Sequence, residues 1–440
     1  MTDTVLAAPV AATPKGPRKR DFGLKRRHAA ERRFRLFGLA AIAIGLGFLA
    51  LLLGSVVLKG YTAFVQTSVT FPIAFDPAII DKDNKRASDP KVLVAANYPV
   101  VARNGLAAVL GVDVKDKKAM KELGNFLSDS SRVPLRDFVT ANPAVIGQTR
   151  DFTLLLSADL DSASKGQIDL GVPEAKRKVS DRQLAWLKTL RDKGMISTPF
   201  NWGLLTFGAS SRPEAAGLGV ALIGSFIMMV VVLVCALPLG VAASIYLEEF
   251  ARKTRFTDFI EVNINNLAAV PSIVYGLLGL SVFINVLGLP RSAPIVGGLV
   301  LSLMTLPTII IATRAALRSV PPSIRAAALG IGASRMQMVF DHVLPLATPG
   351  ILTGTIIGLA RALGETAPLL LIGMVAFVSD YPTNPFEPAT AMPVQIYMWA
   401  NEAERAFVER SSGAIIVLMI MLLLMNLVAI VLRRRFERRW

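Results

Sequence analysis

The stretch IRAAALGIGASRMQMVFDHVLP, which runs from Ile324 to Pro345, lies between two apolar segments that are each long enough to cross a membrane. Its three consecutive alanines predict a helix with a slim surface, and Gly332 permits a sharp break in the chain. Leu344-Pro345 is expected to end a second short helix. A short helix of this kind can lie in a groove of another protein. The stretch therefore predicts a docking element for a soluble partner; the alternative is an ordinary inter-helix loop with chance alanines.

The rest of the chain is apolar enough to be a polytopic membrane protein. Hydrophobic residues make up 53% of its 440 residues and charged residues only 18%, and the apolar residues form long runs. The first run is expected to be an anchor, because its apolar core is too long for a cleavable signal peptide. At about 20 residues per crossing of ~30 Å of hydrocarbon, six segments qualify as membrane spans: Leu36–Leu58, Ala215–Leu247, Leu267–Leu289, Pro294–Thr313, Pro349–Val378 and Gly413–Leu432.

Basic clusters at both ends of the chain predict its orientation. Residues 1–35 hold ten Lys or Arg against three acidic residues, and the tail 433–440 holds five Arg against Glu437. Six spans place both termini on one side, and basic flanks remain cytoplasmic, so we predict cytoplasmic termini. The connection 314–348 then faces the cytoplasm too, with four Arg against Asp341. Flanking a membrane explains these clusters better than nucleic-acid binding does.

The segment 60–212, between the first two spans, is predicted to form an extracytoplasmic domain. Ser180 and Gln183 are spaced as a capping box ahead of an amphipathic helix. A second helix is expected over Lys117–Leu127, and Phe152–Leu156 has the pattern of a strand. We therefore expect a small α+β domain inserted into an all-α membrane protein.

Motifs for catalysis or nucleotide binding are missing from the sequence. The chain has no glycine-rich phosphate loop, its histidines are only His28 and His342, and its one cysteine is Cys235. A Ser-His-Asp triad or a histidine metal cluster is therefore improbable within one chain. We expect no metal, no cofactor and no enzymatic activity, and any energy source must lie on another polypeptide.

Charged and small residues in the fifth predicted span point to a transport pathway. Gly350, Gly354 and Gly358 recur every four residues, so one helix face is bare and lets a neighbouring backbone approach. Arg361 and Glu365 follow on the same side, near the middle of the span. Ionisable groups at that depth cost about 2.5–3.5 kcal/mol each, which makes a pathway role the default hypothesis. The alternative is a mutual ion pair that only fixes helix packing.

Two prolines and two glutamates lie in or near the ends of predicted spans. Pro238 and Pro271 are expected to bend helices, as static kinks more than as hinges. Glu248 and Glu249, at the end of the second span, are interpreted as a solvated helix end.

The spacing within the quoted stretch resembles the EAA loop of ABC importer permeases. That loop has the form EAA, three residues, Gly, nine residues, Ile, one residue, Leu-Pro. Two positions depart from it: Ala326 stands for the usual glutamate and His342 for the usual isoleucine. The resemblance implies that the loop couples the membrane subunit to an ATPase through Ala326, Ala327, Ala328, Gly332, Leu344 and Pro345.

Three further phrases look like the PstA-type permeases of bacterial phosphate importers. They are PLGVAASIYLEEF (Pro238–Phe250), NNLAAVPSIVYGLLGL (Asn265–Leu280) and RALGETAPLLLIG (Arg361–Gly373). The resemblance implies a type I ABC importer permease fold over a core 215–432, in an extended branch with a large external domain. It also implies a second permease subunit of similar fold, two ATPase subunits, an extracytoplasmic phosphate-binding protein, and location in the bacterial inner membrane.

Several functions remain open from the sequence. The leading one is phosphate import by alternating access, with Arg361 near the constriction. Another permease substrate, such as sulfate or molybdate, is the nearest alternative. A membrane-anchored sensor would leave four spans unexplained, and an ion-driven transporter using Arg361 and Glu365 as a proton relay would leave the docking loop unexplained.

Overall fold

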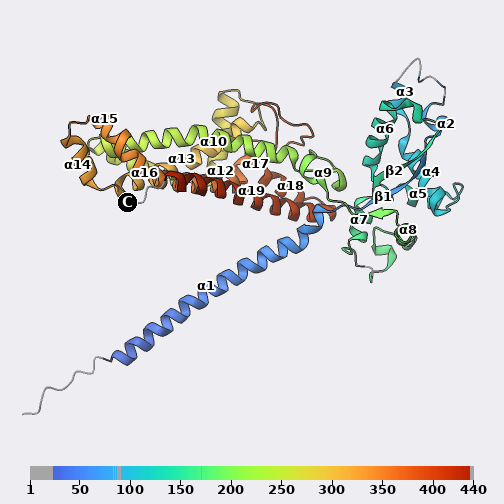
Figure 1. The fold of residues 1–440 in the computed structure, drawn as a ribbon, viewed down its shortest axis with the longest axis horizontal. Helices are drawn as coiled ribbons and strands as arrows, with labels where there is room; N and C mark the ends of the chain where they lie inside the picture. The colour runs from blue at the N-terminus through green and yellow to red at the C-terminus, as the bar shows by residue number, and fades with distance from the viewer. Residues whose placement is uncertain (1–22, 83, 85, 87–90, 170, 437–440) are drawn as a thin grey trace, which may run out of the picture. The chain divides into compact units, whose positions relative to one another are not determined.

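The computed structural model describes residues 23–436, apart from residues 83, 85, 87–90 and 170. The remaining parts of the two basic termini, residues 1–22 and 437–440, lie outside the described residues. The chain divides into two compact units, residues 1–55 and 56–440. In the first unit, α1 (Leu24–Gly60) is one continuous helix that contains the first predicted span and continues into the second unit (Figure 1).

Within the described residues, five helices are long and apolar enough to cross a membrane, and a bent helix pair makes a sixth candidate. The pair consists of α11 (Arg255–Ala268) and α12 (Ser272–Leu278), with a π-helical continuation to Val286. The five helices are α1, α10 (Gly219–Ile245), α13 (Pro294–Ser319), α16 (Leu344–Gly364) and α19 (Ala406–Phe436). The protein is therefore the all-α polytopic membrane protein that the sequence predicts.

The predicted span over Leu267–Leu289 is broken near its start, at the proline that is expected from the sequence to bend a helix. The chain bends by 103° between α11 and α12. Pro271 lies at the bend as the N-cap of α12, because proline lacks an N–H and its ring disfavours helical geometry in the preceding residue. Beyond the bend, Gly276 packs closely against Pro368, so that only hydrogen fits in place of a Cβ atom.

The prediction of a helical span over Pro349–Val378 is also wrong. The long helix begins further back, because α15 (Arg335–Gln337), a π-helical turn (Met338–Val343) and α16 are continuous. Pro345 therefore lies within this continuous helix, directly after the π-helical turn, and does not end a helix. The helix ends at Gly364, because a helical Pro368 would clash with that carbonyl. The short α17 (Ala367–Leu371) follows.

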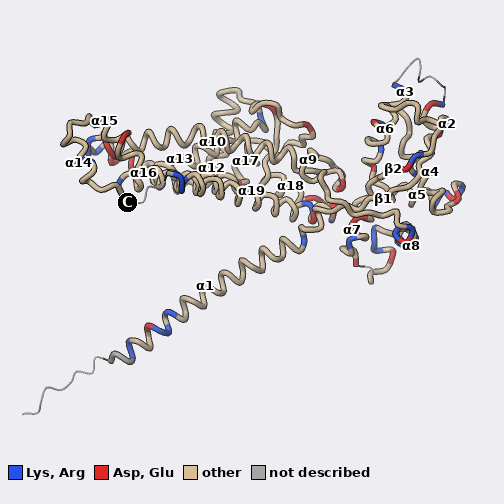
Figure 2. The backbone as a smooth tube through the Cα atoms, viewed as in Figure 1, with Lys and Arg blue, Asp and Glu red and all other residues tan. Residues whose placement is uncertain are grey.

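The helical core is built from α10, α13, α16 and α19, which run side by side (Figure 1). The glycine face of α16 packs on α13: a Cβ atom at Gly350 would lie 2.6 Å from that of Ala316, and Gly354 faces Ala312 as closely. Most charged residues of this core lie at helix ends and connections, leaving long apolar stretches between them (Figure 2). Two shorter helices complete it, α14 (Pro322–Gly330) and α18 (Met392–Ala400).

The inserted domain, residues 60–212, has the predicted α+β architecture. Its antiparallel sheet has the strand order β2-β1-β3 and pairs Phe71 with Phe152. The capping box of Ser180 and Gln183 is confirmed at the start of α8. The elements are β1 (Ser68–Ala74), β2 (Thr149–Leu155), β3 (Ile196–Ser197), α2 (Pro77–Ile80), α3 (Lys91–Ala95), α4 (Tyr98–Leu110), α5 (Lys117–Gly124), α6 (Arg132–Ala141), α7 (Ala158–Ser164), α8 (Asp181–Asp192) and α9 (Trp202–Thr206).

Candidate functional site

The connection between α13 and α16 folds as a helix, a tight turn and a second helix; we call residues 321–343 the coupling segment. Gly332 lies at the turn with φ +88°, a left-handed conformation that glycine adopts without steric cost. Ser334 and Gln337 then form a capping box that starts α15. The predicted break at Gly332 is therefore present, and a capping box makes the second helix begin directly after it.

The coupling segment has one face on the helical core and one facing out. Ala328, Met338 and Val339 are buried in the core, whereas Ala326 and Ala327 are exposed. At the end of α14 the side chain of Ile331 is 82% exposed. An exposed apolar side chain at the tip of a short helix is suited to fill a groove on another protein. Sequence reasoning missed Ile331, because nothing in the local pattern distinguishes it from a buried isoleucine.

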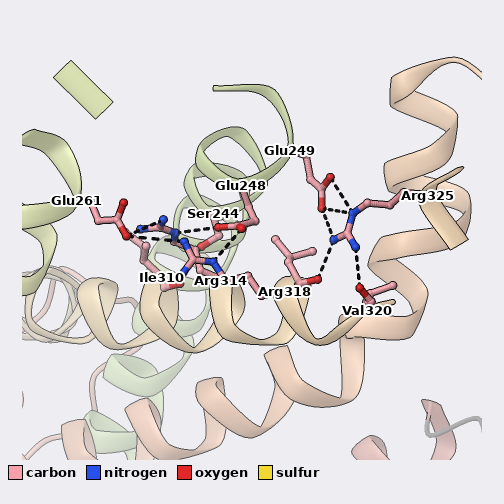
Figure 3. Close-up of polar contacts among 10 residues, drawn as sticks. Ser244, Glu248, Glu249, Glu261, Ile310, Arg314, Arg318, Val320 and Arg325 are labelled. Carbon is pink, nitrogen blue, oxygen red and sulfur yellow. Dashed lines mark hydrogen bonds and ion pairs between the residues drawn. The ribbon is translucent and has the colours of Figure 1, made fainter. Parts of the chain in front are cut away.

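Arg325 attaches α14 to the core through a buried carboxylate (Figure 3). One of its terminal nitrogens, Nη2, lies 2.7 Å from Oε1 of Glu249, and Nε donates to the same carboxylate. The Glu249 side chain is only 6% exposed. The guanidinium also donates to the carbonyls of Leu317 and Val320, at the C-terminal end of α13. Arg325 therefore both pairs a buried charge and caps a helix end.

A second group of ion pairs lies beside the first (Figure 3). Arg314 pairs with Glu248 at 3.3 Å and with Glu261 of α11 at 2.9 Å, and Arg318 pairs with Glu248 at 2.8 Å. Together with Arg325 and Glu249 these residues form what we call the ion-pair cluster. It joins the ends of α10 and α13 to α11 and α14.

The interpretation of Glu248 and Glu249 as a solvated helix end is therefore wrong. Both carboxylates are mostly buried: Glu248 binds two arginines of α13, and Glu249 binds Arg325 of α14. The sequence did contain one signal for this arrangement. The connection 314–348 has four arginines against one acidic residue, and two adjacent glutamates end the preceding span on the same predicted side.

The structure places Arg361 and Glu365 together, but in a looser contact. Arg361 Nε and Glu365 Oε1 are 3.7 Å apart, and the Arg361 side chain is 48% exposed. Arg361 is on the last turn of α16, whereas Glu365 follows the helix end with φ −79° and ψ 128°. The pair therefore lies at a break in the helix and not within a continuous span.

The break lies at mid-depth of the helical core. Gly358, three residues before Arg361, packs against Thr305 and Ile309, near the middle of α13. One helix also links this point to the coupling segment, since Leu344 is the first residue of α16 and Arg361 lies on its last turn. At 1.5 Å per residue, their separation along the helix is roughly 25 Å. A displacement of the coupling segment can therefore reach Arg361 through one element.

The apolar helices are those of a polytopic membrane protein, and comparisons with known proteins place it in a class of import systems. Residues 236–440 match the family described as "Binding-protein-dependent transport system inner membrane component", and residues 21–174 match a "Domain of unknown function (DUF3333)". The chain is 32% identical to "Probable ABC transporter permease protein YqgI" of Bacillus subtilis (strain 168), over 51% of this chain and 80% of that protein.

A second relative indicates a narrower family within this class. It is 33% identical to "Phosphate transport system permease protein PstA 1" of Mycobacterium tuberculosis (strain CDC 1551 / Oshkosh), over 58% of this chain and 83% of that protein. The chain belongs to the PstA-type permeases, within the ABC importer permease class. Among solved structures it is similar to "Inward facing conformations of the MetNI methionine ABC transporter: CY5 native crystal form", at 19% identity and a TM-score of 0.40, covering 50% of this chain and 95% of that chain.

Proposed function

We propose that this protein is the transmembrane permease subunit of an ATP-driven importer that moves inorganic phosphate across the cytoplasmic membrane by alternating access. The proposal rests mainly on the coupling segment, which presents an exposed tip while the ion-pair cluster holds its base against the helical core. The names of the PstA relatives support phosphate as the substrate.

The ion-pair cluster would transmit force from an ATPase. Because Arg325 is bonded both to Glu249 and to the end of α13, α14 cannot move without moving the ends of α10 and α13. Because α16 continues directly from the coupling segment, the same movement shifts the helix that ends near Arg361. Such a coupled movement of packed helices is a rigid-body switch between two openings of the core.

Arg361 would contact the anion at mid-depth. A guanidinium is always charged and can donate two parallel hydrogen bonds to a phosphate. Its contact with Glu365 is long and half open to solvent, so an incoming anion can replace the carboxylate without breaking a buried bidentate pair. Glu365 then serves to neutralise Arg361 between transport events.

The same proposal assigns the topology and the partners. Six crossings, counting the bent pair as one, place both termini in the cytoplasm of a bacterium and the inserted domain outside it. A second permease subunit of similar fold, two ATPase subunits and an extracytoplasmic phosphate-binding protein complete the importer. ATP hydrolysis occurs on the ATPase subunits and not on this chain.

Uptake of radiolabelled phosphate into proteoliposomes that contain the assembled complex tests the proposal. We expect uptake that requires ATP and the binding protein and that excess unlabelled phosphate abolishes. Sulfate and molybdate, added separately in the same excess, should not compete. Competition by either of these anions with no effect of phosphate would reject phosphate as the substrate, and ATP-independent uptake would reject the ATP-driven mechanism.

A further inference from the structure

A cavity that the proposed transport pathway does not use lies where the inserted domain meets the helix ends. Its volume is about 860 Å³. The last turn of α1 and the start of α19 form one side, and α7 with the segment before α8 forms the other. The α1–α19 side is tightly packed, since Gly60 of α1 lies against the backbone of Ser412 of α19 with no room for a side chain.

A buried ion-pair triad fixes this junction. Lys165 of α7 lies 2.7 Å from Asp161 and 3.0 Å from Glu409 of α19, and all three side chains are less than a tenth exposed. Gln167 also donates to the hydroxyl of Thr62. Since Glu409, which lines the cavity, is engaged by Lys165, it does not neutralise the other cations of the lining.

The lining of the cavity has an excess of positive charge. Six Lys or Arg and three Asp or Glu line the cavity, and two of these cations, Lys165 and Arg177, are also paired with carboxylates outside the lining. Lys59, Lys176 and Arg405 have no carboxylate partner within the described part of the chain. A fourth cation, Lys178, makes only a long contact of 3.7 Å with Asp159. Like charges gathered around one concave space repel each other unless a counter-ion joins them.

We propose that this cavity binds a phosphate-type oxyanion, held by Lys59, Lys176 and Arg405. The cations come from three separate elements, so they can surround a tetrahedral anion, and the hydroxyl of Ser162 in the same lining can donate a further hydrogen bond. Free phosphate and the phosphate group of an anionic lipid share this chemistry. A lipid can be the source because Lys59 and Arg405 adjoin the ends of two apolar spans. The proposal does not depend on which anion the permease transports.

The test compares a triple variant, Lys59→Gln, Lys176→Gln and Arg405→Gln, with a matched control. These side chains are exposed, so their neutralisation should leave the fold intact, as thermal unfolding will verify. Exposed lysines of the inserted domain that do not line the cavity supply the control, Lys117→Gln, Lys118→Gln and Lys188→Gln. The full chain is placed in nanodiscs of zwitterionic lipid and titrated with inorganic phosphate.

In a second arm, nanodiscs contain phosphatidylglycerol, and lipid retained by the purified chain is measured by native mass spectrometry. Free-anion binding predicts that the triple variant raises the Kd for phosphate about tenfold or more, while the control does not. Lipid binding predicts instead a retained phosphatidylglycerol that only the triple variant loses. The loss of phosphate or lipid binding in the triple variant should also be observed in a chain that carries Arg361→Gln. This result would separate the cavity from the transport pathway. Equal phosphate and lipid binding by triple variant and control would overturn the proposal.

Discussion

The protein contains two kinds of Arg–Glu contact on the same set of helices, and they differ in how completely the charges are paired. In the ion-pair cluster, the Arg325 guanidinium donates to both oxygens of Glu249 and to two helix-end carbonyls, and little of the carboxylate reaches solvent. At the helix break, Arg361 makes one contact of 3.7 Å with Glu365 and stays half exposed.

The difference indicates which contact is structural and which can exchange partners. A guanidinium that is bonded to a buried carboxylate and to two helix-end carbonyls cannot bind another ligand without leaving a buried charge unpaired, which is strongly destabilising. A half-exposed guanidinium with one long contact gives up little when an anion arrives, because exposed ion pairs contribute only about 0–1 kcal/mol. The same type of ion pair therefore holds the coupling segment in one place and leaves a half-exposed guanidinium in the other.

Arg325→Ala should have the largest effect, because it removes the partner of a buried carboxylate. We expect the free energy of unfolding in detergent micelles to fall by about 3–5 kcal/mol and ATPase subunits to be lost on co-purification. Arg335→Ala is the matched control, since Arg335 is an exposed arginine of the same segment. If both variants behave alike, Arg325 does not hold the coupling segment and the contrast between the two contacts fails.

Arg361→Gln should reduce transport without affecting assembly. The loss of a charge-assisted hydrogen bond of about 1.5–3 kcal/mol corresponds to a roughly tenfold to hundredfold fall in ATP-driven phosphate uptake. Arg361→Lys keeps the charge without the planar pair of donors, so it should recover only part of the activity. Co-purification of the ATPase should stay normal for both. A complex that fails to assemble would instead assign Arg361 to helix packing.

Sequence patterns predicted well those helices that depend only on their local residues. The spans in α1, α10, α13 and α19 follow from long apolar runs, and the break at Gly332 follows from one glycine. In the fifth span, hydropathy missed the helix break after Gly364 because it is insensitive to backbone direction, whereas in the third span the bend was expected from the proline. In both, a proline at an apolar position redirects the chain: Pro271 and Pro368.

The ion-pair cluster could not be derived from local patterns. Its partners are far apart in the sequence: Arg314 comes 66 positions after Glu248, and Arg325 comes 76 positions after Glu249. Each glutamate alone has the appearance of an exposed helix end, and only the fold brings the arginines to them. The Arg361–Glu365 contact was predictable because its residues are four apart, yet its openness depends on the helix break that hydropathy missed.

The glycine face of α16 offers a test of the link between the two contacts. Gly354→Val should destabilise the core by about 1–3 kcal/mol through overpacking, since a Cβ atom there meets Ala312 of α13. Gly358→Ala is the control, because its added Cβ atom finds ordinary contact distance, 3.6 Å from Ile309. Thermal unfolding of the detergent-solubilised chain measures both. If the two variants unfold at the same temperature, α13 and α16 do not pack closely. In that case α16 cannot move together with α13 as one rigid element.

Gly332→Val should have the smallest effect, because it changes only the turn of the coupling segment. A β-branched residue at φ +88° costs about 1–2 kcal/mol, and the strain can be relieved by displacing the exposed tip at Ile331 while the Arg325–Glu249 contact stays intact. ATPase co-purification should therefore weaken with little change in thermal stability. Gly330→Val is the matched control, since Gly330 lies in helical backbone with open space around it. The contrary result would be a large fall in thermal stability with normal ATPase attachment. It would mean that the turn at Gly332 supports the helical core, and that the ion-pair cluster alone does not hold the coupling segment.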